Sequence, residues 1–157
     1  MSLLAAYLDA RRDEGVARLR RILSLRAMVA MGMSQREIAE AVGVTQPAVS
    51  QQLKAARELD AVDPELLVEA AAPILTELAA ERGYSRLAVF GSLARGQATR
   101  DSDVDLLVQA PEGSSTFDFL RFRRLIEKVL GRQVDLVSYG GLKPVVDDDI
   151  RREAVLL

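Results

Sequence analysis

The residues best suited to chemistry in this chain are a Gly-Ser pair and an Asp-x-Asp motif. Gly91-Ser92 follows an apolar run at residues 87–90, and ten residues separate it from Asp103-Val104-Asp105. Residues i and i+2 of a strand share a face, so Asp103 and Asp105 would project side by side. Two adjacent carboxylates repel each other unless a cation lies between them, and hard oxygen ligands select Mg²⁺ or Mn²⁺. The motif therefore predicts a divalent-metal site.

Two further features of the same half of the chain extend this site. Glycine lets the backbone approach a phosphate closely, and Ser92 supplies a donor for a phosphate oxygen. Arg95 adds a cation to the same turn, so Gly91, Ser92 and Arg95 are predicted to bind a nucleotide. Asp135 lies in the middle of an apolar strand predicted at residues 133–137. A charged side chain in an apolar strand needs a partner, and the predicted metal site is the simplest partner available. Asp135 is therefore predicted to be the third carboxylate of that site.

These residues together resemble the polymerase-beta-type nucleotidyltransferase superfamily, and within it the minimal nucleotidyltransferases. The similarity covers residues 64–157, and residues 91–96 match the GS-x-A-R-G form common in the minimal group. The resemblance implies that Asp103 and Asp105 bind two metal ions and that Asp135 completes the site, so that all three are catalytic and ligate metal. ATP would be the donor substrate. Because the chain has no histidine, deprotonation of the attacking hydroxyl would be metal-assisted, with help from Asp135.

The resemblance also bears on the acceptor. After Asp135 only about twenty residues remain, fewer than a separate acceptor domain needs, so we expect the acceptor to bring its own surface. Minimal nucleotidyltransferases of this kind act as antitoxins paired with HEPN-domain ribonuclease toxins, to which they transfer AMP on a tyrosine. Two other hypotheses are a nucleotide-sensing transcription regulator without transferase activity, and an enzyme that nucleotidylates a small molecule. The second of these is disfavoured because no acceptor domain is expected.

The N-terminal half carries a separate pattern of two short helices joined by a glycine turn. The first would begin at a capping box made by Ser34 and Glu37, with Ile38 and Val42 on its apolar face. The pair resembles the helix-turn-helix of bacterial repressors, in which the second helix enters the major groove of DNA. Side chains of Gln, Ser and Thr suit base edges because they both donate and accept hydrogen bonds. The predicted DNA contacts are Thr45, Gln46, Ser50, Gln51 and Lys54.

The alternative for this pattern is a helix hairpin used only for protein contacts. If it binds operator DNA, one copy reads only a few base pairs, and specificity generally requires a second copy at a matching half-site. We therefore expect a homodimer, or a hetero-oligomer with the toxin. The predicted interface is residues 1–31, a helical stretch that Gly15 is expected to divide or kink.

Composition limits the remaining possibilities. The 157 residues are 49% hydrophobic and 28% charged, and they include no cysteine or histidine, which excludes disulfides, thiolate metal sites and Ser-His-Asp triads. No apolar run approaches the length of a membrane span and no signal peptide is evident, so a cytoplasmic protein is expected. The patterns predict an α+β chain, with a helical DNA-binding domain at residues 1–61 and a nucleotidyltransferase domain at residues 62–157. The second domain contains four cations that are predicted to be surface charge rather than an acceptor-binding patch: Arg121, Arg123, Arg124 and Lys128.

Overall fold

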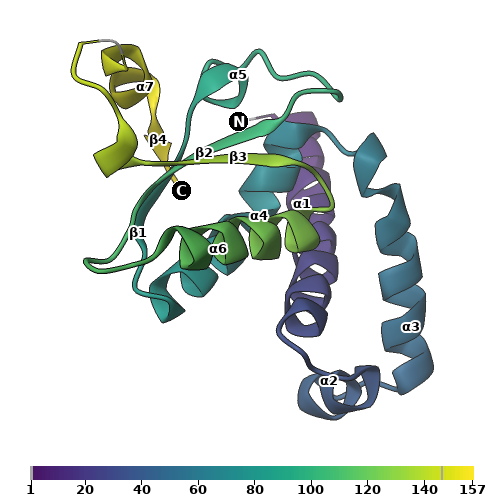
Figure 1. Cartoon of the computed structure of the whole chain (residues 1–157). Helices are drawn as coiled ribbons and strands as arrows, with labels where there is room; N and C mark the ends of the chain where they lie inside the picture. The colour runs from purple at the N-terminus through teal and green to yellow at the C-terminus, as the bar shows by residue number, and fades with distance from the viewer. Residues whose placement is uncertain (1, 146) are drawn as a thin grey trace.

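The N-terminal half of the protein is entirely helical. The computed structural model describes residues 2–145 and 147–157. Within the first range, only the backbone is described for residues 56–58. The first elements are α1 (Leu3–Ala30), α2 (Gln35–Val42), α3 (Gln46–Ala55), the 3-10 helix η1 (Ala56–Ala61) and α4 (Pro64–Glu81). As Figure 1 shows, α2 and α3 project away from the rest of the molecule, whereas α1 and α4 lie against the sheet domain.

The second half contains a small mixed sheet. Its elements are β1 (Ser85–Val89), α5 (Gly91–Ala94), β2 (Val104–Gln109), α6 (Thr116–Leu130), β3 (Val134–Ser138), the 3-10 helix η2 (Tyr139–Gly141), α7 (Asp148–Glu153) and β4 (Val155–Leu156). The strand order is β3-β2-β1-β4, with β2 and β3 parallel and β1 antiparallel to both β2 and β4. The predicted α+β class with a short mixed sheet is confirmed, although β4 was not predicted.

The two faces of the sheet are covered differently. In β2, Val104, Leu106 and Val108 are buried in one core with side chains of α1, α4 and α6. The intervening Leu107 packs on the other face with Ala88 and with residues of the η2–α7 segment. This alternation follows from the period of two in a strand. It means that the odd-numbered positions of β2 face α5 and α7, on the side away from the long helices (Figure 1).

The helix ends have clear causes in the sequence. At the start of α2, Glu37 N donates to Ser34 Oγ (3.1 Å) and Ser34 N donates to Glu37 Oε1 (3.3 Å), which confirms the predicted capping box. The turn after α2 is made by Gly43, whose φ of 76° is the left-handed conformation that glycine tolerates. Ile38 and Val49 are fully buried in a small core that α2 and α3 share with α1.

In the helical half, the structure excludes the division expected at Gly15 and contradicts the placement of Val42. Gly15 does not divide the first helix, because α1 is continuous from Leu3 to Ala30. Val42 does not belong to the apolar face of α2, since its side chain is 47% exposed. Pro73, a residue type that usually kinks or ends a helix, lies inside α4, which is assigned continuously from Pro64 to Glu81.

Two features of α1 bear on how the halves are joined. Its residues from Val16 to Ala27 contribute to the same core as α4, α6 and the sheet, while Leu4 and Tyr7 in its first turns are exposed. The division of the chain near residue 61 stays a prediction. None of the helices in residues 2–145 and 147–157 has the length and apolar character needed to cross a bilayer.

Candidate active site

The predicted metal ligands meet at one end of the sheet. Asp105 in β2 and Asp135 in β3 are direct register partners in the parallel pair. Neighbouring strands lie roughly 5 Å apart, so the two carboxylates project from adjacent strands on the same face. Asp103 is exposed and comes just before Val104, the first residue of β2. The sheet thus brings together three acids that are up to 32 residues apart in the sequence.

The turn after β1 lies directly against Asp105. Phe90 N donates a hydrogen bond to Asp105 O (3.0 Å), which joins the end of β1 to β2. Gly91 has a φ of +68°, and a Cβ at this position would lie 2.3 Å from Asp105 Oδ2. Only glycine satisfies both the left-handed backbone and this close approach. The Gly-Ser turn and the acidic pair therefore form a single site.

The acids of this site are electrostatically coupled. Asp105 is half-buried, and burial is the main cause that raises the pKa of its carboxyl. The negative charges of Asp135, Asp103 and Glu153 raise that pKa further, whereas Arg95 lowers it. In the described part of the chain, no three acidic side chains stand close enough together to hold a metal ion in their present positions. The site is an open group of carboxylates whose mutual repulsion a cation would relieve.

Glu153 at the end of α7 is a site residue that the sequence reasoning missed. Gly91 N donates to Glu153 Oε1 (3.0 Å), and Arg95 Nη1 forms an ion pair with Glu153 Oε2 (3.0 Å). Arg95 Nε also donates to Gln97 Oε1 (3.3 Å). The C-terminal helix thus holds both the glycine turn and the predicted nucleotide-binding arginine. The contact spans 62 residues, so no local spacing in the sequence could have identified it.

The donor atoms at this site fit a divalent metal. Carboxylate oxygens are the ligands that Mg²⁺ and Mn²⁺ prefer, and one glycine turn brings backbone amides close to them. Asp103, Asp105 and Asp135 could hold such a cation. Ser92, which is half-buried in α5, lies next to Gly91 and could donate to a phosphate oxygen.

The predicted DNA-contacting residues lie on and before α3. Thr45 Oγ1 accepts a hydrogen bond from Ala48 N (3.2 Å), so this side chain caps the helix. The exposed members of the set are Gln46, Gln51 and Lys54, and Ser50 is half-buried. Because the Thr45 side chain caps its own helix, the other four predicted residues form the polar surface of α3.

A small mixed sheet that pairs acids on adjacent strands beside a glycine turn defines a site for metal-dependent transfer chemistry on a phosphate-bearing donor. Residues 73–157, more than half of the chain, match the family described as Nucleotidyltransferase domain. The chain belongs to this family and is a nucleotidyltransferase.

Individual relatives agree with this assignment. The chain is 40% identical over 75 residues to a provisionally assigned protein adenylyltransferase of Methanocaldococcus jannaschii, covering 48% of this chain and 81% of that protein. It is 40% identical over 79 residues to the protein adenylyltransferase MntA of Thermococcus cleftensis, covering 50% of this chain and 80% of that protein. A solved structure described as a provisionally assigned minimal nucleotidyltransferase superposes with a TM-score of 0.56 at 41% identity, covering 61% of this chain and 97% of that one.

Proposed function

We propose that this protein is a magnesium-dependent protein adenylyltransferase antitoxin that transfers AMP from ATP to a tyrosine hydroxyl of a HEPN-type ribonuclease toxin. The observation that carries the proposal is the close approach of Gly91 to Asp105, with Asp135 in register beside it. A phosphate bound at the glycine turn would lie next to the three acids. The names of the relatives from Methanocaldococcus and Thermococcus support a protein as the acceptor.

The chain's own side chains have distinct roles in this reaction. Asp103, Asp105 and Asp135 would hold divalent metal, which would supply positive charge to polarise the donor's alpha phosphate and favour deprotonation of the attacking hydroxyl. The amide of Gly91 and the hydroxyl of Ser92 would orient the terminal phosphates. Asp135 is exposed at the edge of the site and would accept the proton of the incoming hydroxyl.

The test of this proposal is transfer of label from α-labelled ATP. The protein is incubated with Mg²⁺, the labelled ATP and the product of the neighbouring gene, and the second protein is analysed for bound label. Label should appear on a tyrosine and be lost with Asp103→Ala or Asp105→Ala. Asp9→Ala, which removes an exposed acid on α1, is the matched control and should transfer normally. Absence of label with every candidate toxin would contradict the proposal.

We also propose that α2 and α3 bind operator DNA, so that the antitoxin represses its own operon. The exposed polar side chains Gln46, Gln51 and Lys54 on α3 support this role. A change of Gln51 and Lys54 to alanine should weaken binding to the promoter DNA of the operon at fixed salt by about tenfold or more. The matched control is Arg36→Ala with Glu40→Ala, an exposed pair on α2. Equal binding by both double variants would place the DNA contact elsewhere.

A nucleotide-sensing regulator remains the second candidate. It is favoured by the joint packing of α1 with α2 and α3 in one core and with α4 and α6 in another. This candidate predicts that ATP alters DNA affinity while no AMP is transferred to any protein. The labelling experiment and the DNA titration with and without ATP therefore separate the two functions.

A further inference from the structure

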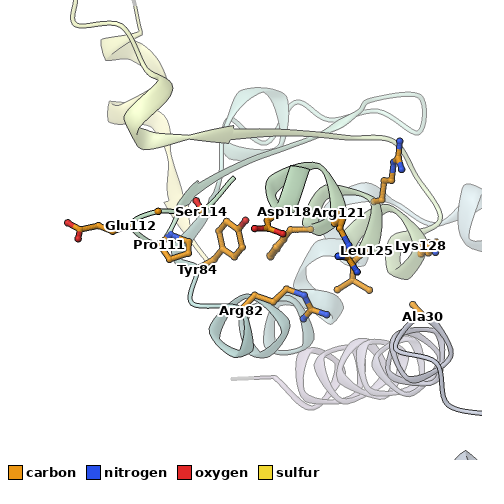
Figure 2. A pocket seen from close by; sticks show the side chains of 13 residues that line it. Ala30, Arg82, Tyr84, Pro111, Glu112, Ser114, Asp118, Arg121, Leu125 and Lys128 are labelled. Atoms are coloured by element: carbon orange, nitrogen blue, oxygen red, sulfur yellow. The ribbon is translucent and has the colours of Figure 1, made fainter. Parts of the chain in front are cut away.

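A second cavity lies away from the aspartates. It has a volume of about 650 Å³ and is bounded by the turn before β1, the turn after β2 and one side of α6 (Figure 2). Small-molecule sites usually enclose roughly 300–1,000 Å³, so a ligand of nucleotide size would fit. Nothing in the proposed transfer reaction uses this cavity.

The sheet topology separates the cavity from the active site. Arg82 and Tyr84 precede β1, and Pro111 follows β2, whereas Gly91 follows β1 and Asp103 precedes β2. Because β1 and β2 are antiparallel, these two groups lie at opposite ends of the sheet. The five residues of β1 span roughly 15 Å at about 3.3 Å per residue. The end of the cavity at Tyr84 and Pro111 therefore lies away from the three aspartates, none of which lines the cavity.

The walls of the cavity are rich in cations. Arg121, Arg124 and Lys128 are spaced i, i+3 and i+7 on α6, which places them on one face of the helix, and all three line the cavity. Arg82 adds a fourth positive charge on the opposite wall and is fixed there by hydrogen bonds to Leu78 O (3.0 Å) and Met31 Sδ (3.1 Å). The sequence prediction that the α6 cations are ordinary surface charge is therefore incomplete, because three of them share a concave wall.

The cavity also contains acids. Asp118 and Glu112 line it together with the four cations, so positive charge exceeds negative charge by two. Asp118 lies near the ring of Tyr84, whereas the α6 cations extend along the wall toward Lys128 (Figure 2). The positive charge is thus concentrated toward the α1 end of the cavity, and an anionic group would bind there.

Tyr84 provides an independent sign of a missing ligand. Its side chain is only 5% exposed and packs edge-on against Phe122 at 4.5 Å between ring centroids. Its hydroxyl is buried and has no hydrogen-bond partner in the described part of the chain. A buried polar group without a partner destabilises the folded protein, so such groups are few. Burial and the charge of Asp118 raise the pKa of this hydroxyl, which keeps it protonated and able to donate.

We propose that this cavity is a binding site for a phosphate-bearing small molecule of mononucleotide size. The guanidinium groups of Arg121 and Arg124 would bind phosphate oxygens in a bidentate manner, and Lys128 would add a point charge. Tyr84 would donate a hydrogen bond to a ligand oxygen, and Leu125 would contact the apolar part of the ligand. Binding at this site needs no metal, unlike binding at the aspartates.

The test uses AMP and inorganic pyrophosphate as probes, in EDTA so that the metal-dependent site is not loaded. Binding is measured by calorimetry and by backbone amide shifts in NMR spectra. Both probes should shift the amides of Tyr84 and Ser114 and leave those of Gly91 and Ser92 in place. Stronger binding of AMP would identify a nucleotide ligand, and equal binding of the two probes would identify a site for phosphate alone.

Three variants separate this site from general charge attraction. Changing Arg121, Arg124 and Lys128 to glutamine should weaken binding at least about tenfold, the effect of losing one charge-assisted hydrogen bond. Tyr84→Phe keeps the ring and should weaken binding several-fold without loss of folding. The control has the same change in net charge and alters three exposed arginines of α1: Arg11, Arg18 and Arg21.

Several results would overturn the proposal. These are equal weakening by the α1 and α6 variants, shifts confined to the Gly91 turn, or no binding of either probe at millimolar concentration. Binding of poly-glutamate without either phosphate probe would instead identify a surface for acidic protein segments. None of these results depends on AMP transfer, so the cavity and the transferase activity can fail separately.

Discussion

Replacing Asp105 with asparagine should make the protein more stable but inactive. Asp105 is half-buried, and the negative charges of Asp135 and Asp103 raise the pKa of its carboxyl in addition to burial. Asparagine has nearly the same shape and removes one of the repelling charges. Transfer activity should be lost with it, because one of the three proposed metal ligands is gone.

The size of the stabilisation follows from the strand spacing. Two unit charges roughly 5 Å apart repel by about 3 kcal/mol at an effective dielectric constant of ~20. Asp103 and Asp135 are exposed, and solvent screening reduces the net cost to about 1 kcal/mol. For a chain of this length, about 1 kcal/mol corresponds to an increase in Tm of roughly 2–4 °C.

The pH dependence has a definite sign. The pKa of Asp105 is raised in the folded state, so the folded protein binds this proton more tightly than the unfolded chain does. The contribution of Asp105 to the stability of the parent protein should therefore fall as pH rises above about 4, the usual pKa of an aspartate. The advantage of Asp105→Asn should be present at pH 7.5 and vanish below about pH 4.

Thermal melts followed by circular dichroism, with EDTA or with Mg²⁺, provide the assay. Saturating metal stabilises a protein by about 2.7 kcal/mol at a concentration one hundred times the Kd. The parent protein should gain this stability and Asp105→Asn should not, so the order of the two Tm values should reverse between EDTA and Mg²⁺. Asp9→Asn, an exposed acid on α1, should behave as the parent. A lower Tm for Asp105→Asn in EDTA at pH 7.5, or an equal gain with Mg²⁺ in both proteins, would refute the reasoning.

Three further substitutions test the site and the core. Gly91→Ala should reduce transfer at least about 100-fold because its Cβ would meet Asp105 Oδ2 at 2.3 Å; Gly113→Ala, with a similar φ of +75° and nothing within 4 Å, is the control and should transfer normally. Glu153→Gln weakens the contacts that hold Gly91 N and Arg95 away from a phosphate, so it should lower the KM for ATP several-fold, whereas Asp149→Asn, which breaks the exposed pair with Arg152, should leave the KM unchanged. Leu23→Ala should lower the free energy of unfolding, measured in urea, by about 2–5 kcal/mol, since Leu23 is fully buried. A loss below about 1 kcal/mol would show that α1 packs less tightly than described.

The central acids could be predicted because strand geometry is local. The spacing of Asp103 and Asp105 and the apolar residues after them predict both carboxylates on one face of a strand; in the structure Asp105 is in β2, and Asp103 lies one residue before its start. Asp135 could be added because an acid inside an apolar strand needs a partner. Its carboxylate is in fact exposed, so it lies at the edge of the site rather than inside the core.

Glu153 could not be predicted, because its position depends on how the end of the chain folds back. Leu157 N donates to Leu87 O (3.0 Å), and Val155 pairs with Val89, so β4 extends the sheet beside β1. This pairing brings α7 against the Gly91 turn. A strand of two residues has no sequence period to recognise, and the contact it creates is therefore visible only in three dimensions.

The absence of a helix break at Gly15 has a similar origin. A glycine inside a helix costs about 1 kcal/mol relative to alanine, which favours a break when the helix is considered alone. Val16 and Leu19, directly after it, are buried in the core with α4 and α6. Tertiary packing of the following turns offsets the local cost, and the helix continues through the glycine.

The C-terminal helix also determines which groups at the active site can receive a phosphate. Glu153 accepts the hydrogen bond of Gly91 N and pairs with Arg95, so its carboxylate occupies the donors that a terminal phosphate of ATP would use. A triphosphate that binds this amide must displace Glu153, and Arg95 would then turn to the phosphate in the same movement. Hydrogen exchange at residues 148–156 should therefore increase when ATP and Mg²⁺ bind, because α7 loses its contact with the turn. Unchanged exchange with ATP bound would mean that Ser92 holds the phosphate while Glu153 stays in place.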